Sequence, residues 1–488
     1  TISNLVFMKK IFTLLVVAMT AMSSMAANYT DSLTVTVNGQ SVEQHATISV
    51  DKDQDGLLTF SLNNFILSMG GQEMGIGNIV IDKLQPMVAG TDTLLECSRG
   101  IYITEGNDPN VAVWVGPNLQ EVPINFVAKL SHGRVYASIS IYMEALQQNI
   151  DVTFGSGYQI PNSGFENYHT YAYDIDEPLR WHSFATAGGM LASMVCQTAH
   201  TFQSEDVRPG STGSTSLSLK ATSIFGFIAN GTVTTGRMIA GSISALDPQN
   251  HAELEMSSTE VDGNGNPYYI NMVGRPDSLA VWVKFSQAKA NKKHPYATVS
   301  AYITDGTRFQ DPQDKTYGNV MAKAVNNTIA TTGGEWKRIV VPFTYVNDSI
   351  DGKAILVTIS TNADPGQGSD GDEIIIDDFE LIYDAELTNV TLVGDEVKPE
   401  LKGKGAFCVV SYDKNEANEN IATIKVYSDD LKTHFTKTFN MTTAGIGSVE
   451  ANGAVRKIYN VGGQLVNDMK AGQVYIVKEG GKTFKVLK

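Results

Sequence analysis

Apolar and polar residues alternate at every second position through most of the chain, which is the pattern of β-strands with one buried face. Leu58, Phe60 and Leu62, for example, share one face of such a run, and polar residues lie between them. Similar runs lie at residues 33–39, 136–142, 296–304, 355–360 and 373–383. Turn-forming pairs such as Asn38-Gly39 separate several of these runs. Because helical periodicity is scarce, the pattern predicts an all-β protein built of sandwiches or barrels.

Changes in composition divide this pattern into domains. The chain has 488 residues, which is enough for about three domains. A Gly-Ser-Gly stretch at 155–157 precedes a segment rich in Asn, Tyr and His, and a new set of strands begins after Tyr383. The units expected are residues 8–26, 28–155, 158–384, 387–444 and 448–488.

Residues 8–26 have the three parts of a signal peptide. Lys9 and Lys10 are positively charged, residues 11–22 are mostly apolar, and the segment ends in a small-x-small site at Ala26. We therefore expect cleavage after Ala26 and an exported protein that is extracellular, at the outer-membrane surface or periplasmic. The apolar stretch is too short to span a membrane.

Charge and cysteine content narrow the classes of partner. The net charge of −16 repels phosphate backbones, so we expect no nucleic-acid partner. A neutral polysaccharide or a metal cation is compatible with this charge. Cys97, Cys196 and Cys408 are too far apart for a disulfide framework or a zinc site, and we expect buried thiols.

Residues 28–155 read as successive antiparallel hairpins, which predict an up-and-down barrel because closure removes exposed sheet edges. The later part carries W-x-G-P, E-V-P and V-T-F-G in that order. With these motifs the segment resembles the calycin-like β-barrel domain of exported Bacteroidetes proteins. The resemblance implies an apolar ligand inside the barrel. The alternative, which we favour because small barrels are usually packed solid, is that Trp114, Phe126 and Tyr142 fill the core.

The central segment carries several blocks in a specific order, among them I-P-N-S-G-F-E-N-Y, E-P-L-R-W-H-S-F, R-P-D-S-L-A-V-W-V-K-F, G-G-E-W-K-R-I-V-V-P-F-T-Y and D-E-I-I-I-D-D-F-E-L-I-Y. With these blocks residues 158–384 resemble a Bacteroidetes carbohydrate metabolism domain family. The resemblance implies a jelly-roll β-sandwich similar to carbohydrate-binding modules. It also implies a structural Ca2+ held by Glu166 with Asp377 or Asp378, since hard cations take carboxylate oxygens. The alternative is that these residues are ordinary polar or capping groups.

Alternation within the central segment predicts an outward aromatic surface. If the apolar residues of 278–285 face the core, Trp282 and Lys284 face outward, and the same argument places Tyr296 and Tyr302 outward on a later strand. Aromatic rings stack on the flat C–H faces of sugars, and Arg275 at a strand entrance could reach a ligand hydroxyl. We therefore predict glycan binding by these residues. The alternatives are that a loop or a neighbouring domain covers this face and that Arg275 forms a salt bridge.

Catalytic motifs give no support for an enzyme. The chain has no metalloprotease, nucleophile-elbow or phosphate-loop motif, so no catalytic residue is assigned. A glycoside hydrolase remains an alternative, because its two carboxylates need no local motif. A structural surface adhesin is the other alternative.

The remaining segments extend the expectation of a cell-surface protein. Strand patterns over 387–444 predict a small Ig-like β module. Residues 448–488 contain I-Y-N-x-x-G-Q-x-V, G-x-V-Y-I-V and a basic K-V-L-K end, and so resemble the C-terminal sorting domain of type IX secretion. This resemblance implies export to the cell surface, with glycans and other cell-surface components as partners.

Overall fold

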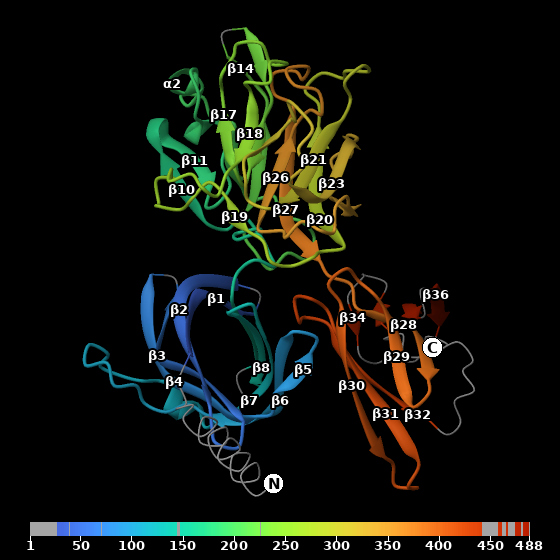
Figure 1. The fold of residues 1–488 in the computed structure, drawn as a ribbon. Coiled ribbons are helices and arrows are strands. Elements are labelled where there is room, and N and C mark those ends of the chain that lie inside the picture. The colour runs from blue at the N-terminus through green and yellow to red at the C-terminus, as the bar shows by residue number, and fades with distance from the viewer. Residues whose placement is uncertain are drawn as a thin grey trace, which may run out of the picture. The chain divides into compact units, whose positions relative to one another are not determined.

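The structure is a computed structural model in which nearly all regular structure is β-strand, so the predicted all-β class is confirmed (Figure 1). It describes residues 27–441 apart from 39, 70, 144–146 and 225, and the backbones of strands at 457–460, 465–466, 474–479 and 482–487. The expected signal peptide at 8–26 lies outside the described residues. Among the residues described, no helix is both long and apolar enough to cross a membrane.

The chain divides into two compact units, Thr1–Ile382 and Tyr383–Lys488. The first unit holds two separate sets of sheets, a barrel and a β-sandwich. Each is described by itself below.

The barrel is a single nine-stranded antiparallel sheet with the order β4-β3-β2-β1-β9-β8-β7-β6-β5. Its strands are β1 (Ala27–Val37), β2 (Gln40–Lys52), β3 (Leu58–Met69), β4 (Gln72–Leu84), β5 (Met87–Ala89), β6 (Asp92–Tyr102), β7 (Glu121–Ser131), β8 (Arg134–Met143) and β9 (Gln148–Phe154). Most neighbours in the sheet are consecutive in the chain, and β9 returns to pair with β1, as an up-and-down barrel requires. Asn78 in β4 exchanges backbone hydrogen bonds of 2.8 and 3.1 Å with Thr104, just past β6, which brings the two sides of the sheet together.

The barrel core follows the predicted alternation. Phe126 is buried and packs edge-on against Phe60, with ring centres 5.1 Å apart. Tyr142 differs from expectation because Ile139 and Ile141 take the inward positions of β8, which turns the tyrosine out to solvent. Trp114 is half-buried in the segment after β6, where it lies against glycines rather than in the core.

The sandwich consists of two antiparallel sheets and several smaller pieces. The five-stranded sheet has the order β12 (Thr201–Ser204), β13 (Ser216–Lys220), β27 (Glu373–Ile382), β20 (Ser278–Ser286) and β24 (Lys337–Pro342). The second sheet has the order β16 (Thr232–Thr234), β26 (Ala354–Ser360), β21 (Ala297–Thr304), β23 (Val320–Ile329) and β25 (Thr344–Tyr345), with β19 (Ile270–Asn271) also paired to β26. The apolar residues of β20 from Leu279 to Phe285 are fully buried, as their alternation predicted.

Smaller elements surround these two sheets. They are the hairpins β10 (Tyr168–Tyr171) with β11 (Ile175–Pro178) and β14 (Thr222–Ile224) with β15 (Phe227–Ala229), the sheet of β17 (Arg237–Ile239), β18 (His251–Leu254) and β22 (Phe309–Asp311), and the helix α2 (Ala192–Val195). The β17-β18-β22 sheet shares a separate apolar cluster with β21 and β26, which includes Tyr302, Phe309 and Leu356. The small β17-β18-β22 sheet therefore covers the outer face of the β21-β26 sheet, and a second apolar core lies between them.

The C-terminal unit is also entirely β in its described part. Its strands are β28 (Glu386–Val393), β29 (Glu396–Lys402), β30 (Phe407–Lys414), β31 (Asn420–Tyr427) and β32 (His434–Asn440), followed by β33 (Lys457–Asn460), β34 (Leu465–Val466), β35 (Val474–Glu479) and β36 (Lys482–Leu487). The β28-β29 hairpin packs its Leu387 and Val390 against Ile424 and Val426 of the β30-β31-β32 sheet. The last four strands form a separate sheet in the segment that resembles a sorting domain.

Candidate functional site

The predicted aromatic residues do not form one surface. Trp282 and Lys284 lie on β20 in the five-stranded sheet, whereas Tyr302 lies on β21 in the other sheet. Side chains that leave the core of a sandwich from its two sheets point in opposite directions. The expectation of one face shared by Trp282 and Tyr302 is therefore wrong, because strand alternation says which residues leave the core but not which sheet a strand joins.

Tyr302 is also not exposed as expected. Its side chain is 8% exposed, and its ring packs against Phe309 of the covering sheet with ring centres 4.8 Å apart. Burial, with Asp311 nearby, raises the pKa of the Tyr302 phenol. Tyr302 is thus part of a packed layer, which is the alternative considered for this face.

Tyr296 and Arg275 lie apart from Trp282. Tyr296 precedes β21 and is 40% exposed. Arg275 forms an ion pair with Asp348, and its guanidinium carbon lies 5.0 Å from the ring centre of Tyr345. The structure therefore shows the salt bridge that was the alternative role for Arg275.

A second tryptophan joins Trp282 and Lys284 on the outer side of the five-stranded sheet. Trp336, which precedes β24, donates its indole N–H to Asp206 at 3.1 Å, and Lys284 donates to the other oxygen of the same carboxylate at 2.6 Å. Trp282 and Lys284 are two residues apart on one face of β20, about 6.5 Å along the strand. We call Trp282, Lys284, Trp336, Asp206 and Arg338 the tryptophan face.

The tryptophan face mixes half-buried rings with charged groups. Both tryptophans are half-buried, and Arg338, opposite Trp282 in the neighbouring strand, pairs with Glu380 at 3.1 Å. The hydrogen bond from Lys284 lowers the pKa of the Asp206 carboxyl, assisted by the bond from Trp336 and opposed in part by burial. Asp206 therefore stays ionised at neutral pH and holds its carboxylate against the Trp336 indole and the Lys284 ammonium group.

Sequence reasoning placed neither Trp336 nor Asp206 among the ligand-binding residues. A tryptophan just ahead of an edge strand was visible in the sequence. Asp206, however, lies in the loop between β12 and β13, and its contacts with residues 284 and 336 follow from the fold alone.

The carboxylates expected to hold Ca2+ have other partners. Glu166 accepts hydrogen bonds from the backbone N–H groups of Ser214 and Thr215 at 3.0 and 3.1 Å. Asp378 accepts a 2.5 Å bond from the guanidinium of Arg208, whose backbone N–H donates to Asp377 at 2.9 Å. Within the described residues, no group of three or more acidic, His or Cys side chains is arranged to hold a metal ion.

This arrangement is unfavourable for a cation, because N–H groups donate to the oxygens of Glu166 and Asp377 and the positively charged guanidinium of Arg208 bonds Asp378. Asp377 is fully buried, and this burial raises its pKa to about 6. The expected calcium stays a prediction that only a binding measurement tests.

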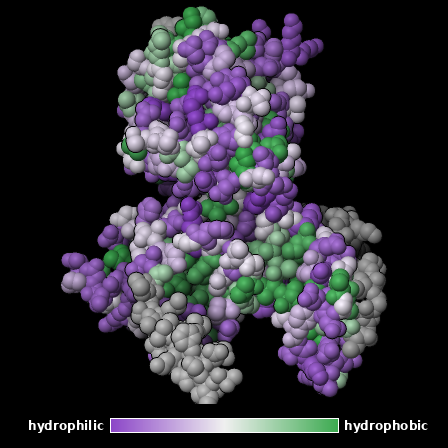
Figure 2. Space-filling model, in the orientation of Figure 1, coloured by the Kyte–Doolittle hydropathy of each residue, from purple (hydrophilic) through white to green (hydrophobic). Residues whose placement is uncertain are grey.

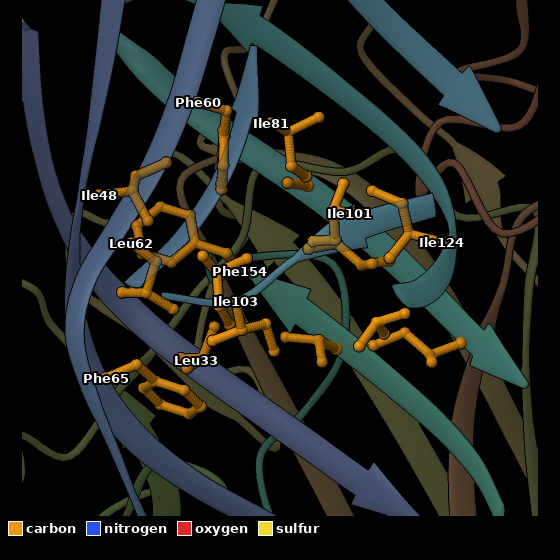
Figure 3. Close-up of a pocket in the computed structure, with 16 residues that line it drawn as sticks. Leu33, Ile48, Phe60, Leu62, Phe65, Ile81, Ile101, Ile103, Ile124 and Phe154 are labelled. Atoms are coloured by element: carbon orange, nitrogen blue, oxygen red, sulfur yellow. The ribbon is translucent and has the colours of Figure 1, made fainter. Parts of the chain in front are cut away.

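The barrel encloses a small apolar cavity (Figure 3). Its volume is about 50 Å³, and all of its lining side chains are apolar, including Phe60, Phe65, Ile101 and Phe154. A dry apolar cavity that holds benzene has roughly 150 Å³. The barrel interior is therefore mainly a packed core, and a ligand of ordinary size does not fit it as it stands.

Comparisons with known proteins support the barrel and little else. The comparison with curated proteins found no match. Among solved structures, one match is the M60 catalytic domain with the CBM51-1 and CBM51-2 domains from Clostridium perfringens ZmpB, at 11% identity and a TM-score of 0.15. The alignment covers 93% of this chain and 45% of that one, so the chain spans less than half of that protein's length. A TM-score this low supports no inference about fold or function.

The family comparison is specific to the amino-terminal barrel. Residues 25–156 match the family described as the calycin-like beta-barrel domain. The match covers the nine barrel strands and agrees with the resemblance seen in the sequence motifs. Over residues 25–156 the chain is therefore similar to calycin-like β-barrel domains, in agreement with the barrel that the structure shows.

Proposed function

We propose that this protein binds glycans through the tryptophan face of its sandwich. The observation that carries the proposal is the pair of half-buried tryptophans, Trp282 and Trp336, on one side of one sheet. Trp336 and Lys284 both donate to Asp206, and the Arg208 guanidinium lies 5.6 Å from the ring centre of Trp282. Sugar rings stack their C–H faces on indoles, and their hydroxyls bond to the charged groups between them. The resemblance of residues 158–384 to carbohydrate-module families supports the same class of ligand.

The charged groups of the tryptophan face, Lys284, Asp206 and Arg338, suit a polar ligand. On the one side of the sandwich seen in Figure 2, hydrophilic residues dominate and hydrophobic residues are scattered among them. Glycans need this combination of isolated aromatic rings and hydrogen-bonding groups, whereas a stable protein partner needs a larger apolar area. Export to the cell surface, where such glycans are met, stays a prediction from the amino-terminal segment.

The energy available per ring is modest. Burying about 100 Å² of apolar surface on one indole contributes about 2.5 kcal/mol before ordering costs. Loss of one ring is therefore expected to weaken binding roughly 10- to 60-fold. A contribution of this size from each ring, reduced by ordering costs, is what a weak and reversible glycan-binding surface needs.

A glycan array with the full-length protein tests the proposal. Trp282→Ala and Trp336→Ala should each lose most of the binding, while the control Tyr142→Ala, which removes an exposed ring from the barrel, should keep it. Thermal melts of every variant confirm that each is folded. Unchanged binding by both tryptophan variants, or no binding of any glycan by the wild type, would refute the proposal.

The same array distinguishes the two alternatives. Release of new reducing ends from a bound glycan would favour a glycoside hydrolase over a binding protein. If the folded protein binds no glycan on the array, the structural adhesin is favoured.

A further inference from the structure

Glu166, in the amino-terminal segment of the sandwich, and Asp378, in β27, both lie against Gly164. Gly164 lies between them: a Cβ atom placed on it would be 3.4 Å from an oxygen of Asp378 and 3.9 Å from Cγ of Glu166. Asp377 adjoins Asp378 at an irregularity in the pairing of β27 with β20, and Asp378 has the positive φ of 43°. The backbone N–H of Phe379 donates to Ser163 at 3.0 Å, so this irregularity holds the amino-terminal segment against β27.

Arg208 supplies the positive charge at this junction. Its backbone N–H bonds Asp377 and its guanidinium bonds Asp378, which ties the β12–β13 loop to the last strand of the sandwich. The guanidinium carbon also lies 5.6 Å from the ring centre of Trp282, in the range of a cation–π contact. The same loop caps Glu166 through Ser214 and Thr215.

The adjacent carboxylates of Asp377 and Asp378 need a positively charged partner. A buried carboxylate is costly unless it is paired and hydrogen-bonded, and Asp377 is fully buried beside a second carboxylate. A guanidinium and a divalent cation repel each other, so they do not share one pair of carboxylates. The Arg208 guanidinium bonds one oxygen of Asp378, so a divalent cation on this carboxylate would lie beside a positive charge.

We propose that Arg208 takes the place of a structural divalent cation, so that a side chain of the β12–β13 loop, and not a metal, fastens the amino-terminal segment to β27. The junction is then independent of calcium. This inference does not rest on glycan binding, since it concerns how the sandwich is held together.

Thermal unfolding of the full-length protein with CaCl2 and with EDTA is the first test. The wild type should melt at the same temperature in both. Arg208→Gln should lower the Tm by roughly 5 °C or more, because it leaves the paired carboxylates without a counter-charge. Arg208→Lys, which keeps the charge but not the planar donor group, should recover part of the loss.

A matched control separates this role from ordinary surface pairing. Arg338→Gln breaks the exposed Arg338–Glu380 pair on the same sheet and should change the Tm by about 1 °C or less. Adding Asp378→Asn to Arg208→Gln should restore stability, since the uncompensated charge is removed. The proposal is overturned if calcium stabilises the wild type, if Arg208→Gln behaves like Arg338→Gln, or if Asp378→Asn makes the Arg208→Gln variant worse.

Discussion

The buried side chain of His200 is expected to make the sandwich less stable at acidic pH. The side chain is fully buried just before β12, with Nδ1 3.1 Å from the carbonyl oxygen of Lys220 and its ring 5.2 Å from that of Phe184. The other ring nitrogen is buried and has no hydrogen-bond partner among the residues that the structure describes. Burial lowers the pKa of His200 to about 4, against a partial opposing effect of the Lys220 hydrogen bond.

The direction of the change in stability with pH depends on whether the folded or the unfolded state binds the proton. Between pH 6.5 and 4 the unfolded chain protonates this histidine while the folded protein does not, so stability is lost as the pH falls through this window. A shift of about 2.5 units corresponds to about 3 kcal/mol when the loss is complete. At pH 5 the loss relative to pH 8 is about 2 kcal/mol, because the unfolded state is then almost fully protonated.

Urea unfolding at pH 7.5 and 5.0 tests this value with His200→Asn, whose amide can keep the bond to the Lys220 carbonyl. Trp181, Trp282 and Trp336 are three of the four tryptophans and all lie in the sandwich, so fluorescence reports mainly on this domain. Between the two pH values the wild type should lose about 2 kcal/mol more than the variant. His45→Asn, at an exposed site on β2, serves as the matched control. Equal pH dependence of wild type and His200→Asn would refute the reasoning.

Three further predictions concern single residues. Burial raises the pKa of Asp377 to about 6, so the protonated carboxyl contributes to stability at low pH, and this contribution is lost as the pH rises through 6. In the same urea series, Asp377→Asn should therefore reduce the fall in the free energy of unfolding over this pH range. Gly77→Ala should cost about 2 kcal/mol or more in thermal melts, because its φ is 124° and a Cβ would meet a carbonyl oxygen at 2.2 Å, whereas Gly133→Ala, with open space around it, should cost about 1 kcal/mol. Phe126→Ala should destabilise the barrel by about 3–5 kcal/mol, and Tyr142→Ala by about 0.5 kcal/mol or less; similar losses in both would contradict the assigned core.

Local sequence patterns predicted the features that depend on one strand or hairpin alone. The alternation over β3 and β20 identified the buried face of each strand, because every second side chain points the same way. The hairpin pattern before residue 155 also predicted the barrel that the family comparison supports.

Features that depend on distant pairing were not predictable from such patterns. The strands that cover Tyr302 are three or four residues long, too short to show a period. Arg208 lies in a loop, and its partners Asp377 and Asp378 follow about 170 positions later. Only the assembled sheets bring such groups together, so the contacts of Asp206 with Trp336 and of Arg208 with Asp377 and Asp378 could not be predicted from the sequence.

The sheet order has a consequence for how the chain matures during synthesis. β13 pairs directly with β27, with Leu217 opposite Ile376, and β20 pairs with β27 on its other side. A growing chain therefore exposes the unpaired edges of β13 and β20 until β27 has been made, and such edges readily pair with other chains. Loop closure over this distance also slows folding. We expect a chain that ends before residue 373 to aggregate, whereas one that continues through β27 can complete its sandwich in one cooperative step.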